Sequence, residues 1–318
     1  MHATRSIRAA LFLAAALALA CGPALAQNKV RFAYLKTINI IPFFYANQKG
    51  YFKAEGVDLE LIAVQGGPAA AAAIASGSAD VAYAAPTVVI TARAQQQPFR
   101  YVIGLDWERT PDRLYDIMLA SKRSGVKSFK DLVGKTVLMN APGSLTEMAW
   151  RDWLAKSGMK WSDVKVLVNP FPQNQAMLEL GTADAVAGAE PFIASMKRSK
   201  VEPVILGRGF LAEETRRYAI DGIFASDTWA AANGKTIAAM KRALAKGVSD
   251  LKSDRTLMRK IMIDEYKLKP EVVDSITVPV DPHLDLEAQD LVPVLEAMER
   301  TGMVKPGLSA SDLVVGGK

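Results

Sequence analysis

Side chains that form covalent enzyme intermediates or hold transition metals are scarce in this sequence. The 318 residues include one cysteine, Cys21, and two histidines, His2 and His283. Thiol nucleophiles and Cys-type zinc sites need cysteine, and catalytic triads and most zinc centres need histidine. We therefore expect no catalytic residues, no metal site and no cofactor. His283 follows Asp281-Pro282, which is typical of a turn, so we expect it in a surface loop.

Long hydrophobic runs are absent as well. The N-terminal run, residues 11–20, has ten residues, whereas a helix that crosses a bilayer needs about 20. Arg5 and Arg8 precede this run, and Ala24-Leu25-Ala26 follows it with the small-x-small pattern that signal peptidase cleaves. The sequence predicts that residues 1–26 are a signal peptide, that cleavage follows Ala26, and that the protein is exported to the periplasm.

Cys21 offers an alternative N-terminus, because bacterial lipoproteins are modified on a cysteine. A lipidated cysteine usually has a leucine three positions upstream, and Ala18 stands there instead, so we expect peptidase cleavage. The remaining 318 − 26 = 292 residues carry 39 − 2 = 37 basic and 33 acidic side chains, a charge of +4, and no cysteine. The basic residues form scattered pairs such as Arg216-Arg217, without a continuous stripe, so we expect no nucleic-acid partner.

Strand and helix patterns alternate along the chain, whose length corresponds to about two domains. Val30, Phe32 and Tyr34 alternate with other residues as in a strand, and Pro42 opens a helix that ends near Gly50. A second alternating strand, 57–61, is followed by an alanine-rich helix over 68–76. This alternation predicts a mostly parallel sheet with helices on both faces.

An internal repeat indicates a second unit of the same kind. Residues 77–82 read Gly-Ser-Ala-Asp-Val-Ala and precede Pro86, and residues 181–186 read Gly-Thr-Ala-Asp-Ala-Val and precede Pro191. The offset is 181 − 77 = 104 residues, and the first strands, near Val30 and Thr136, differ by 136 − 30 = 106. Because two landmarks recur at nearly the same interval, the sequence predicts two α/β lobes of similar topology.

The chain is expected to pass between these lobes twice, near residues 114–116 and near 219–222, and two crossings make a hinge. Residues 222–225 are expected to rejoin the first sheet as a strand, and apolar stripes that begin at Ile237 and at Leu291 predict helices beyond it. The expected division is 27–114 for the first part of lobe 1, 115–219 for lobe 2, and 220–318 for the return strand and C-terminal helices of lobe 1.

Four loops are candidates for the binding site, because ligands of open α/β sheets bind beyond the carboxyl ends of the strands, where helices begin. These loops are residues 36–39, 65–67, 85–87 and 140–144. Their glycines allow close approach, and their neutral side chains can hydrogen-bond an oxyanion or a polar head. A structural alternative for residues 144–147, Ser-Leu-Thr-Glu, is a capping box. The candidates are Thr37, Asn39, Gln65, Gly66, Gly67, Pro86, Thr87, Asn140, Gly143 and Ser144.

Aromatic and charged residues near the expected cleft complete the candidate site. Aromatic rings can form its walls, although most rings in α/β proteins are core. Glu190, before Pro191, can accept an N–H from a ligand or pair with the hinge, and Arg109 and Asp116 can contact a ligand or join the lobes. The candidates are Phe43, Trp107, Asp116, Phe171 and Glu190, with Phe44 and Tyr83 as further walls.

Several segments carry a family resemblance. They include Phe32-Ala33-Tyr34, residues 50–60 with Gly50-Tyr51-Phe52 and Glu55-Gly56-Val57, residues 75–84, residues 131–137, and residues 183–185 with Glu190-Pro191. In these segments, from about residue 30 to 192, the chain resembles the nitrate/sulfonate/taurine-type periplasmic binding proteins of ABC importers. Relatives often carry tryptophan before Glu-Pro, whereas this chain has Ala189.

The resemblance implies a type II periplasmic binding protein fold: two α/β lobes with mixed, mostly parallel sheets, joined by a two-crossing hinge. It also implies a monomer that captures a small solute by lobe closure and delivers it to an ABC transporter permease in the inner membrane. The expected solute is a small organic anion or a polar ring compound, of the sulfonate, taurine, nitrate or aromatic carboxylate class.

Three alternatives remain within this resemblance. The protein can bind a thiamine pyrimidine precursor, or it can pass its ligand to a membrane sensor. It can also be an enzyme similar to the thiamine-pyrimidine synthases, which act on a histidine and pyridoxal phosphate and carry a cysteine-rich motif. The sequence disfavours the enzyme, because no cysteine follows residue 26.

Overall fold

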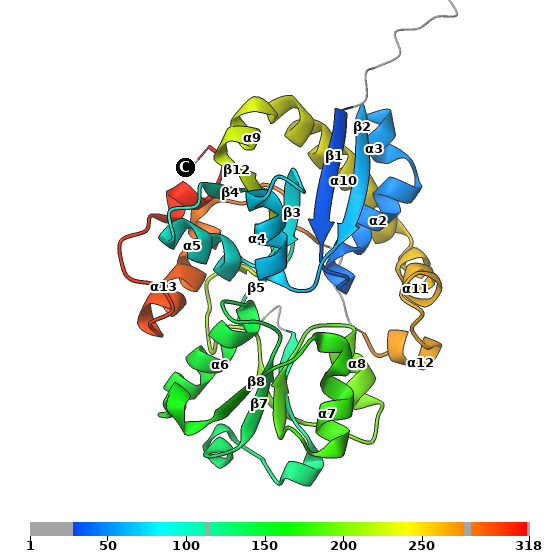
Figure 1. Cartoon of the computed structure of the whole chain (residues 1–318). Coiled ribbons are helices and arrows are strands. Elements are labelled where there is room, and N and C mark those ends of the chain that lie inside the picture. The colour runs from blue at the N-terminus through cyan, green and yellow to red at the C-terminus, as the bar shows by residue number, and fades with distance from the viewer. Residues whose placement is uncertain (1–27, 112–114, 277–280, 317–318) are drawn as a thin grey trace, which may run out of the picture.

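Two five-stranded sheets form the centres of two lobes, one above the other in Figure 1. The computed structural model describes residues 28–111, 115–276 and 281–316, so the predicted signal peptide lies outside the described residues. The sheet of lobe 1 has the order β2 (Val57–Ala63), β1 (Asn28–Tyr34), β3 (Val81–Ala84), β12 (Gly222–Ser226), β4 (Phe99–Gly104). The sheet of lobe 2 has the order β8 (Lys165–Val168), β7 (Thr136–Met139), β9 (Ala185–Ala187), β6 (Asp116–Ala120), β10 (Val204–Arg208).

The two sheets have the same topology. In lobe 1, β1 pairs in parallel with β2 and β3, and β12 runs antiparallel between β3 and β4. In lobe 2, β7 pairs in parallel with β8 and β9, and β6 runs antiparallel between β9 and β10. The predictions of mixed, mostly parallel sheets and of a return strand in the first sheet are confirmed.

The aspartates of the repeated Gly-x-Ala-Asp segments have the same role in both lobes. The Oδ2 atom of Asp80 accepts a hydrogen bond from the Arg31 backbone N–H at 2.8 Å, and Asp184 accepts one from the Thr136 N–H at 2.8 Å. The backbone N–H groups of the two aspartates donate back to the carbonyls of Arg31 and Thr136. Asp80 therefore joins β1 to β3, and Asp184 joins β7 to β9, where β3 and β9 are the central strands of their sheets.

Helices cover both faces of the first sheet. Val30 and Phe32 of β1 pack in one core with α2 and α10, whereas Ala33 packs in a second core with α4, α5 and α13. No helix among residues 28–111, 115–276 and 281–316 has the length and apolar composition needed to cross a membrane. Lobe 1 contains α2 (Ile41–Gln48), α3 (Tyr51–Ala54), α4 (Gly67–Ala75), α5 (Pro86–Ala94), α9 (Asp227–Ala232), α10 (Gly234–Ser253), α11 (Arg255–Asp264), α12 (Pro270–Val273) and α13 (Val292–Arg300), and lobe 2 contains α6 (Leu145–Lys156), α7 (Asn174–Leu180) and α8 (Phe192–Lys197).

The lobes are joined by a two-stranded sheet, in which β5 (Trp107–Glu108) pairs antiparallel with β11 (Tyr218–Ala219). The fully buried carboxylate of Glu108 accepts hydrogen bonds from the N–H groups of Tyr115, at 3.0 Å, and Phe210, at 2.8 Å. It also accepts one from the hydroxyl of Tyr218. Burial and the Glu108 charge raise the pKa of Tyr218 well above its usual value, so this hydroxyl keeps its proton. Glu108 thus ties both crossing segments to lobe 2.

His283 lies in a loop, as predicted, but it is half-buried rather than a surface residue. Its backbone N–H donates to the Leu105 carbonyl at 2.8 Å, and the N–H of Gly104 donates to the Leu284 carbonyl at 3.1 Å. This loop therefore covers the end of β4, next to the hinge.

A methyl group at Gly104 would disturb this packing. Its Cβ would lie 2.2 Å from the His283 carbonyl oxygen and 2.9 Å from the Leu286 Cβ. We expect Gly104→Ala to lower the free energy of unfolding by about 1–3 kcal/mol, measured by urea denaturation, because overpacking forces the backbone to move. Gly234→Ala is the matched control: nothing lies within 4 Å of its added Cβ, and we expect no loss of stability. Equal stability of the two variants would contradict this account of the β4 contact.

Candidate functional site

Two adjoining cavities lie between the lobes. The inner chamber, about 90 Å³, is lined by the loops that follow β1 and β3 in lobe 1, by Asp221, and by the start of α6 with Phe171 and Phe210 in lobe 2. The outer chamber, about 370 Å³, is lined by the loop after β2, by Pro170–Pro172, and by Tyr266 and Leu268, which follow α11. Leu35, Thr37, Asn140 and Phe171 line both chambers. The cleft therefore draws its walls from loops of both lobes.

A buried carboxylate organises the lobe 1 side of the inner chamber. Asp221, which precedes β12, is 3% exposed. Its Oδ2 accepts hydrogen bonds from Asn39 Nδ2 at 2.7 Å and from the Tyr83 hydroxyl at 2.7 Å. Its Oδ1 accepts the N–H of Asp106 at 2.9 Å, in the first crossing segment. Asp221 therefore links the hinge to the side chains that line the cleft.

The donor of each hydrogen bond in this network can be assigned, because the Asp221 carboxylate only accepts hydrogen bonds. Burial, together with the charge of Asp221, raises the pKa of Tyr83 well above its usual value, so Tyr83 donates its one proton to Asp221. Thr37 Oγ1, 3.1 Å from the Tyr83 oxygen, must then donate its own proton to that oxygen. With its proton committed, Thr37 Oγ1 is a hydrogen-bond acceptor, and Asn39 presents its amide oxygen as an acceptor beside one remaining Nδ2 proton.

A second network orients Asn140, at the end of β7 in lobe 2. Thr146 Oγ1 donates to the Asn140 amide oxygen at 2.7 Å, so the hydroxyl of Ser144, 3.0 Å from Thr146 Oγ1, donates to Thr146. Ser144 Oγ also accepts the N–H of Glu147 as the N-cap of α6. Across the described parts of the chain, no protein acceptor takes the Asn140 Nδ2 protons. Lobe 2 therefore offers an oriented amide donor.

The capping box predicted for residues 144–147 forms in part. Ser144 accepts from the Glu147 N–H, but the Glu147 carboxylate accepts from the N–H of Gly143, at 2.7 Å, instead of from that of Ser144. The N–H of Gly143 is thus occupied by its own helix, and Gly143 lines a separate groove beside α4 and α5. Within the described ranges, Gly143 therefore lines neither chamber.

Nine of the predicted residues line the chambers. Thr37, Asn140 and Phe171 line both, and the others line one of them. The exposed Gln65 and the half-buried Gly66 lie at the outer chamber. The residues that line one chamber are Asn39, Gly67, Tyr83 and Ser144 for the inner and Gln65 and Gly66 for the outer.

Other candidates lie outside both chambers. The ring of Phe43 is buried in the lobe 1 core against Phe32 and Phe52, on the face of the sheet that carries α10. Trp107 lies in the hinge strand β5, where its indole N–H donates to the Asp281 carbonyl at 3.1 Å. Neither ring lines a chamber in the described part of the chain, because Phe43 packs in the core and Trp107 packs at the hinge.

Three polar or helix-start candidates, Pro86, Thr87 and Glu190, line neither chamber in the described structure. Pro86 and Thr87 are buried at the start of α5, and their neighbours Ala85 and Val88 line the inner chamber instead. The Glu190 carboxylate accepts the N–H of Ala194 at 3.0 Å, within α8. Asp116 lies in β6, and its side chain is outside the described part of the chain.

Sequence reasoning missed Asp221 and Tyr266 as residues that line the chambers. Asp221 lies in the predicted second crossing, directly before the return strand, and this position is the sequence feature that could have identified it as a cleft residue. Tyr266 reaches the cleft only because the segment after α11 folds back, where its hydroxyl donates to the Thr37 carbonyl at 2.7 Å. No local pattern reveals such a long-range contact.

Charges are sparse in the chambers. Among the residues that line them in the described structure, Lys36 is the one cation and Asp221 the one carboxylate. In the same described ranges, no three His, Cys, Asp or Glu side chains come together as a metal-ligand set. Most of the polar groups that the two lobes offer to a ligand here are therefore uncharged hydrogen-bonding groups.

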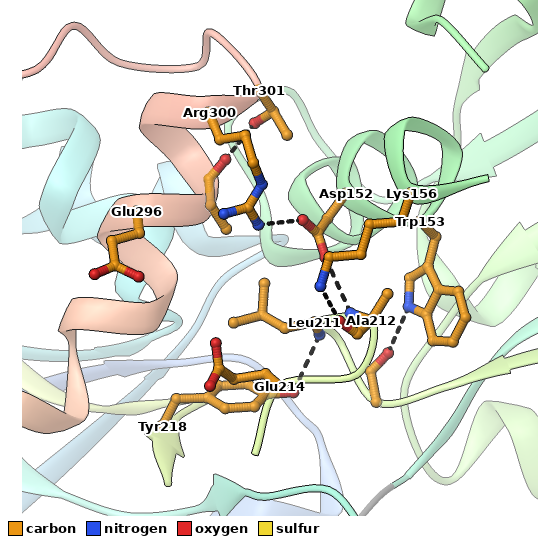
Figure 2. A network of polar contacts seen from close by, with 12 residues as sticks. Asp152, Trp153, Lys156, Leu211, Ala212, Glu214, Tyr218, Glu296, Arg300 and Thr301 are labelled. Carbon is orange, nitrogen blue, oxygen red and sulfur yellow. Dashed lines mark hydrogen bonds and ion pairs between the residues drawn. The ribbon is translucent and has the colours of Figure 1, made fainter. Parts of the chain in front are cut away.

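Beside the cleft, charged residues join the lobes directly. Helix α13 packs against α5 of lobe 1 and α6 of lobe 2. Figure 2 shows Arg300, at the end of α13, donating to the fully buried carboxylate of Asp152 in α6. The other Asp152 oxygen accepts the N–H of Ala212 at 3.0 Å, and Lys156 lies 3.9 Å away. In Figure 1, α13 and α6 lie on the left of the molecule, and α11 and α12 lie on the right.

The sequence is similar to known proteins over most of its length. The profile of a family described as NMT1/THI5 like matches residues 37–255. A riboflavin-binding protein, RibY of Chloroflexus aurantiacus, is 28% identical over 232 residues, or 72% of this chain. The match spans 63% of the length of that relative.

Solved structures of periplasmic binding proteins have the same fold. The alkanesulfonate-binding protein SsuA of Xanthomonas axonopodis pv. citri, bound to MOPS, superposes with a TM-score of 0.76 at 20% identity, over 91% of this chain and 99% of that one. The nitrate-binding protein NrtA of Synechocystis PCC 6803 gives a TM-score of 0.69 at 17% identity, over 88% and 83%. These likenesses establish the fold.

The Arg300–Asp152 pair provides a test of how the lobes are held together. We expect Arg300→Leu to lower the free energy of unfolding by about 1–3 kcal/mol, because the Asp152 carboxylate loses a charged donor while it stays buried. Thermal and urea denaturation measure this loss.

The matched control is Arg259→Leu. Arg259 pairs with Asp274 at 2.8 Å, but both side chains are about half exposed, so little stability should be lost. Equal effects of the two substitutions would show that burial of Asp152 does not strengthen the contact between lobes.

Proposed function

The chain belongs to the NMT1/THI5-like family, and on this premise we propose that it is the solute-binding component of an ABC importer. It captures a small solute in the cleft and delivers it to a permease in the inner membrane. The observation that carries the proposal is a cleft whose hydrogen-bonding groups come from both lobes, on either side of a two-stranded hinge. The proposal includes cleavage of residues 1–26, residence of the mature chain in the periplasm, and a monomer.

Closure follows from the division of polar groups between the lobes. A solute that bonds Thr37 and Asn39 touches lobe 1 alone, and it gains the Asn140 amide when lobe 2 approaches. Because affinity is then higher in the closed state, the solute shifts the population toward closure. The closed form is the one that the permease receives.

The solute class we favour is a neutral polar ring. Sulfonates and nitrate only accept hydrogen bonds, and the lobe 1 side offers them acceptor atoms beside a buried carboxylate. A heterocycle with neighbouring N–H and C=O groups can donate to lobe 1 and accept from Asn140. A thiamine pyrimidine precursor fits this description, and so does the ring system of riboflavin, which the relative RibY is named for.

Small organic anions are the second candidate, because SsuA and NrtA are named for alkanesulfonate and nitrate. The unpaired N–H groups at the start of α4 and the exposed Lys36 support this class. The proposal assigns no catalytic step to the chain, since a synthase of the related kind would need the cysteine-rich motif that residues 27–318 lack.

A ligand screen tests the function. Sulfonates, taurine, nitrate, aromatic carboxylates, aminopyrimidines and riboflavin are added to the mature protein, and its melting temperature is measured. We expect a polar ring compound to raise it, because binding to the native state at 100 times Kd adds about 2.7 kcal/mol. If no solute stabilises the protein, while turnover appears with a cofactor, the transport proposal fails.

The variant Asn140→Ala tests whether the solute binds at the Asn140 loop. We expect the affinity for the stabilising solute to fall about tenfold, as calorimetry measures it, because one oriented donor is lost. Asn47→Ala, on α2 and away from both chambers, is the control and should leave the affinity unchanged. Unchanged affinity in Asn140→Ala would remove this loop from the site.

A further inference from the structure

The outer chamber is larger than the capture of a small polar head requires. Its volume of about 370 Å³ is within the range of pockets that hold whole small molecules, about 300–1,000 Å³. The inner chamber already contains the acceptors of lobe 1 and shares Asn140 with the outer one. A solute bound by the inner chamber alone would leave this adjoining space to water.

Aromatic rings from both lobes face this space. Phe171 and Phe192 stack on each other in lobe 2, with centroids 5.7 Å apart and planes at 22°. Tyr266, from the segment after α11, lines the opposite side of the chamber in lobe 1. All three side chains are half-buried and line the cavity, so each retains ring surface for a further partner.

Apart from the Asn140 amide, which both chambers share, the polar side chains of the outer chamber are committed or stand at its rim. The Tyr266 hydroxyl donates to the Thr37 carbonyl, so this residue presents its ring. Lys36 Nζ lies 5.1 Å from the Tyr266 ring centroid and donates to the Glu265 carbonyl. Lys36 and Gln65 are exposed, at the solvent side. The middle of the chamber is thus lined mostly by apolar and ring surface.

We propose that the outer chamber is a second subsite, which binds an aromatic ring carried by the same solute whose polar head occupies the inner chamber. This inference rests on the proposed function, and it narrows the solute to a two-part molecule. The ring packs between Phe192 of lobe 2 and Tyr266 of lobe 1. It therefore adds apolar contacts that form only when the lobes come together.

Matched pairs of probes test the subsite without knowledge of the natural solute. The pairs are ethanesulfonate with 2-phenylethanesulfonate, and uracil with 5-benzyluracil. Within each pair the head is the same and one member adds a ring. For the head class that binds, we expect calorimetry to give a Kd about tenfold lower for the ring-bearing member.

The variant Phe192→Ala separates this subsite from the head site, because Phe192 lines the outer chamber alone. We expect it to bring the two members of a pair to equal affinity while the Kd of the head-only member stays within about twofold. Phe192→Tyr, which keeps a ring, should restore the difference. Its melting temperature, and that of Phe192→Ala, report whether the fold is retained.

Three results would overturn the inference. They are equal affinity of the two probes in the unaltered protein, an equal loss for both probes in Phe192→Ala, and failure of both pairs to bind. The proposed function fails separately, when no solute of the thermal screen stabilises the protein while turnover appears with a cofactor. A head-only probe that binds without any gain from the ring would thus contradict the second subsite and leave the transport function intact.

Discussion

The arrangement of the two lobes depends on one buried carboxylate at the hinge, Glu108. It accepts hydrogen bonds from Tyr115, Phe210 and Tyr218, which lie in the segments that enter and leave lobe 2. A buried carboxylate must be satisfied, so these segments are held together at one point. With the crossings fixed there, the carboxyl ends of the parallel strands in both sheets face the same cleft.

A second buried carboxylate, Asp221, connects this hinge to the cleft. It accepts hydrogen bonds from the Asp106 N–H in the first crossing and from the side chains of Asn39 and Tyr83. Because these groups donate to Asp221, lobe 1 presents acceptor atoms to the cleft. On lobe 2 the chain of hydroxyls through Thr146 leaves the Asn140 amide as a donor. Two complementary surfaces on hinged bodies are a physical basis for reversible capture, since neither surface satisfies a ligand alone.

The sequence predicts this fold well because its signals are local and repeated. The Gly-x-Ala-Asp repeat marks aspartates that join corresponding strands in each lobe, and the strand at 222–226 returns as predicted. The site is predicted less completely. Loops at strand ends identify Thr37 and Asn140. The local sequence around Phe43, however, does not distinguish a ring that lines the cleft from one that faces the core, and Phe43 faces the core. Contacts that depend on the folded chain, such as that of Tyr266, have no local signal.

The central claim is that a solute bound between the lobes holds them closed. Because the chain after residue 26 has no cysteine, spin labels can be placed at Lys53→Cys in lobe 1 and Leu180→Cys in lobe 2, both exposed. Double electron–electron resonance then measures the distance between lobes with and without the solute that most stabilises the protein. The account predicts a shorter and narrower distance distribution on binding. A distribution unchanged by a saturating solute would contradict it.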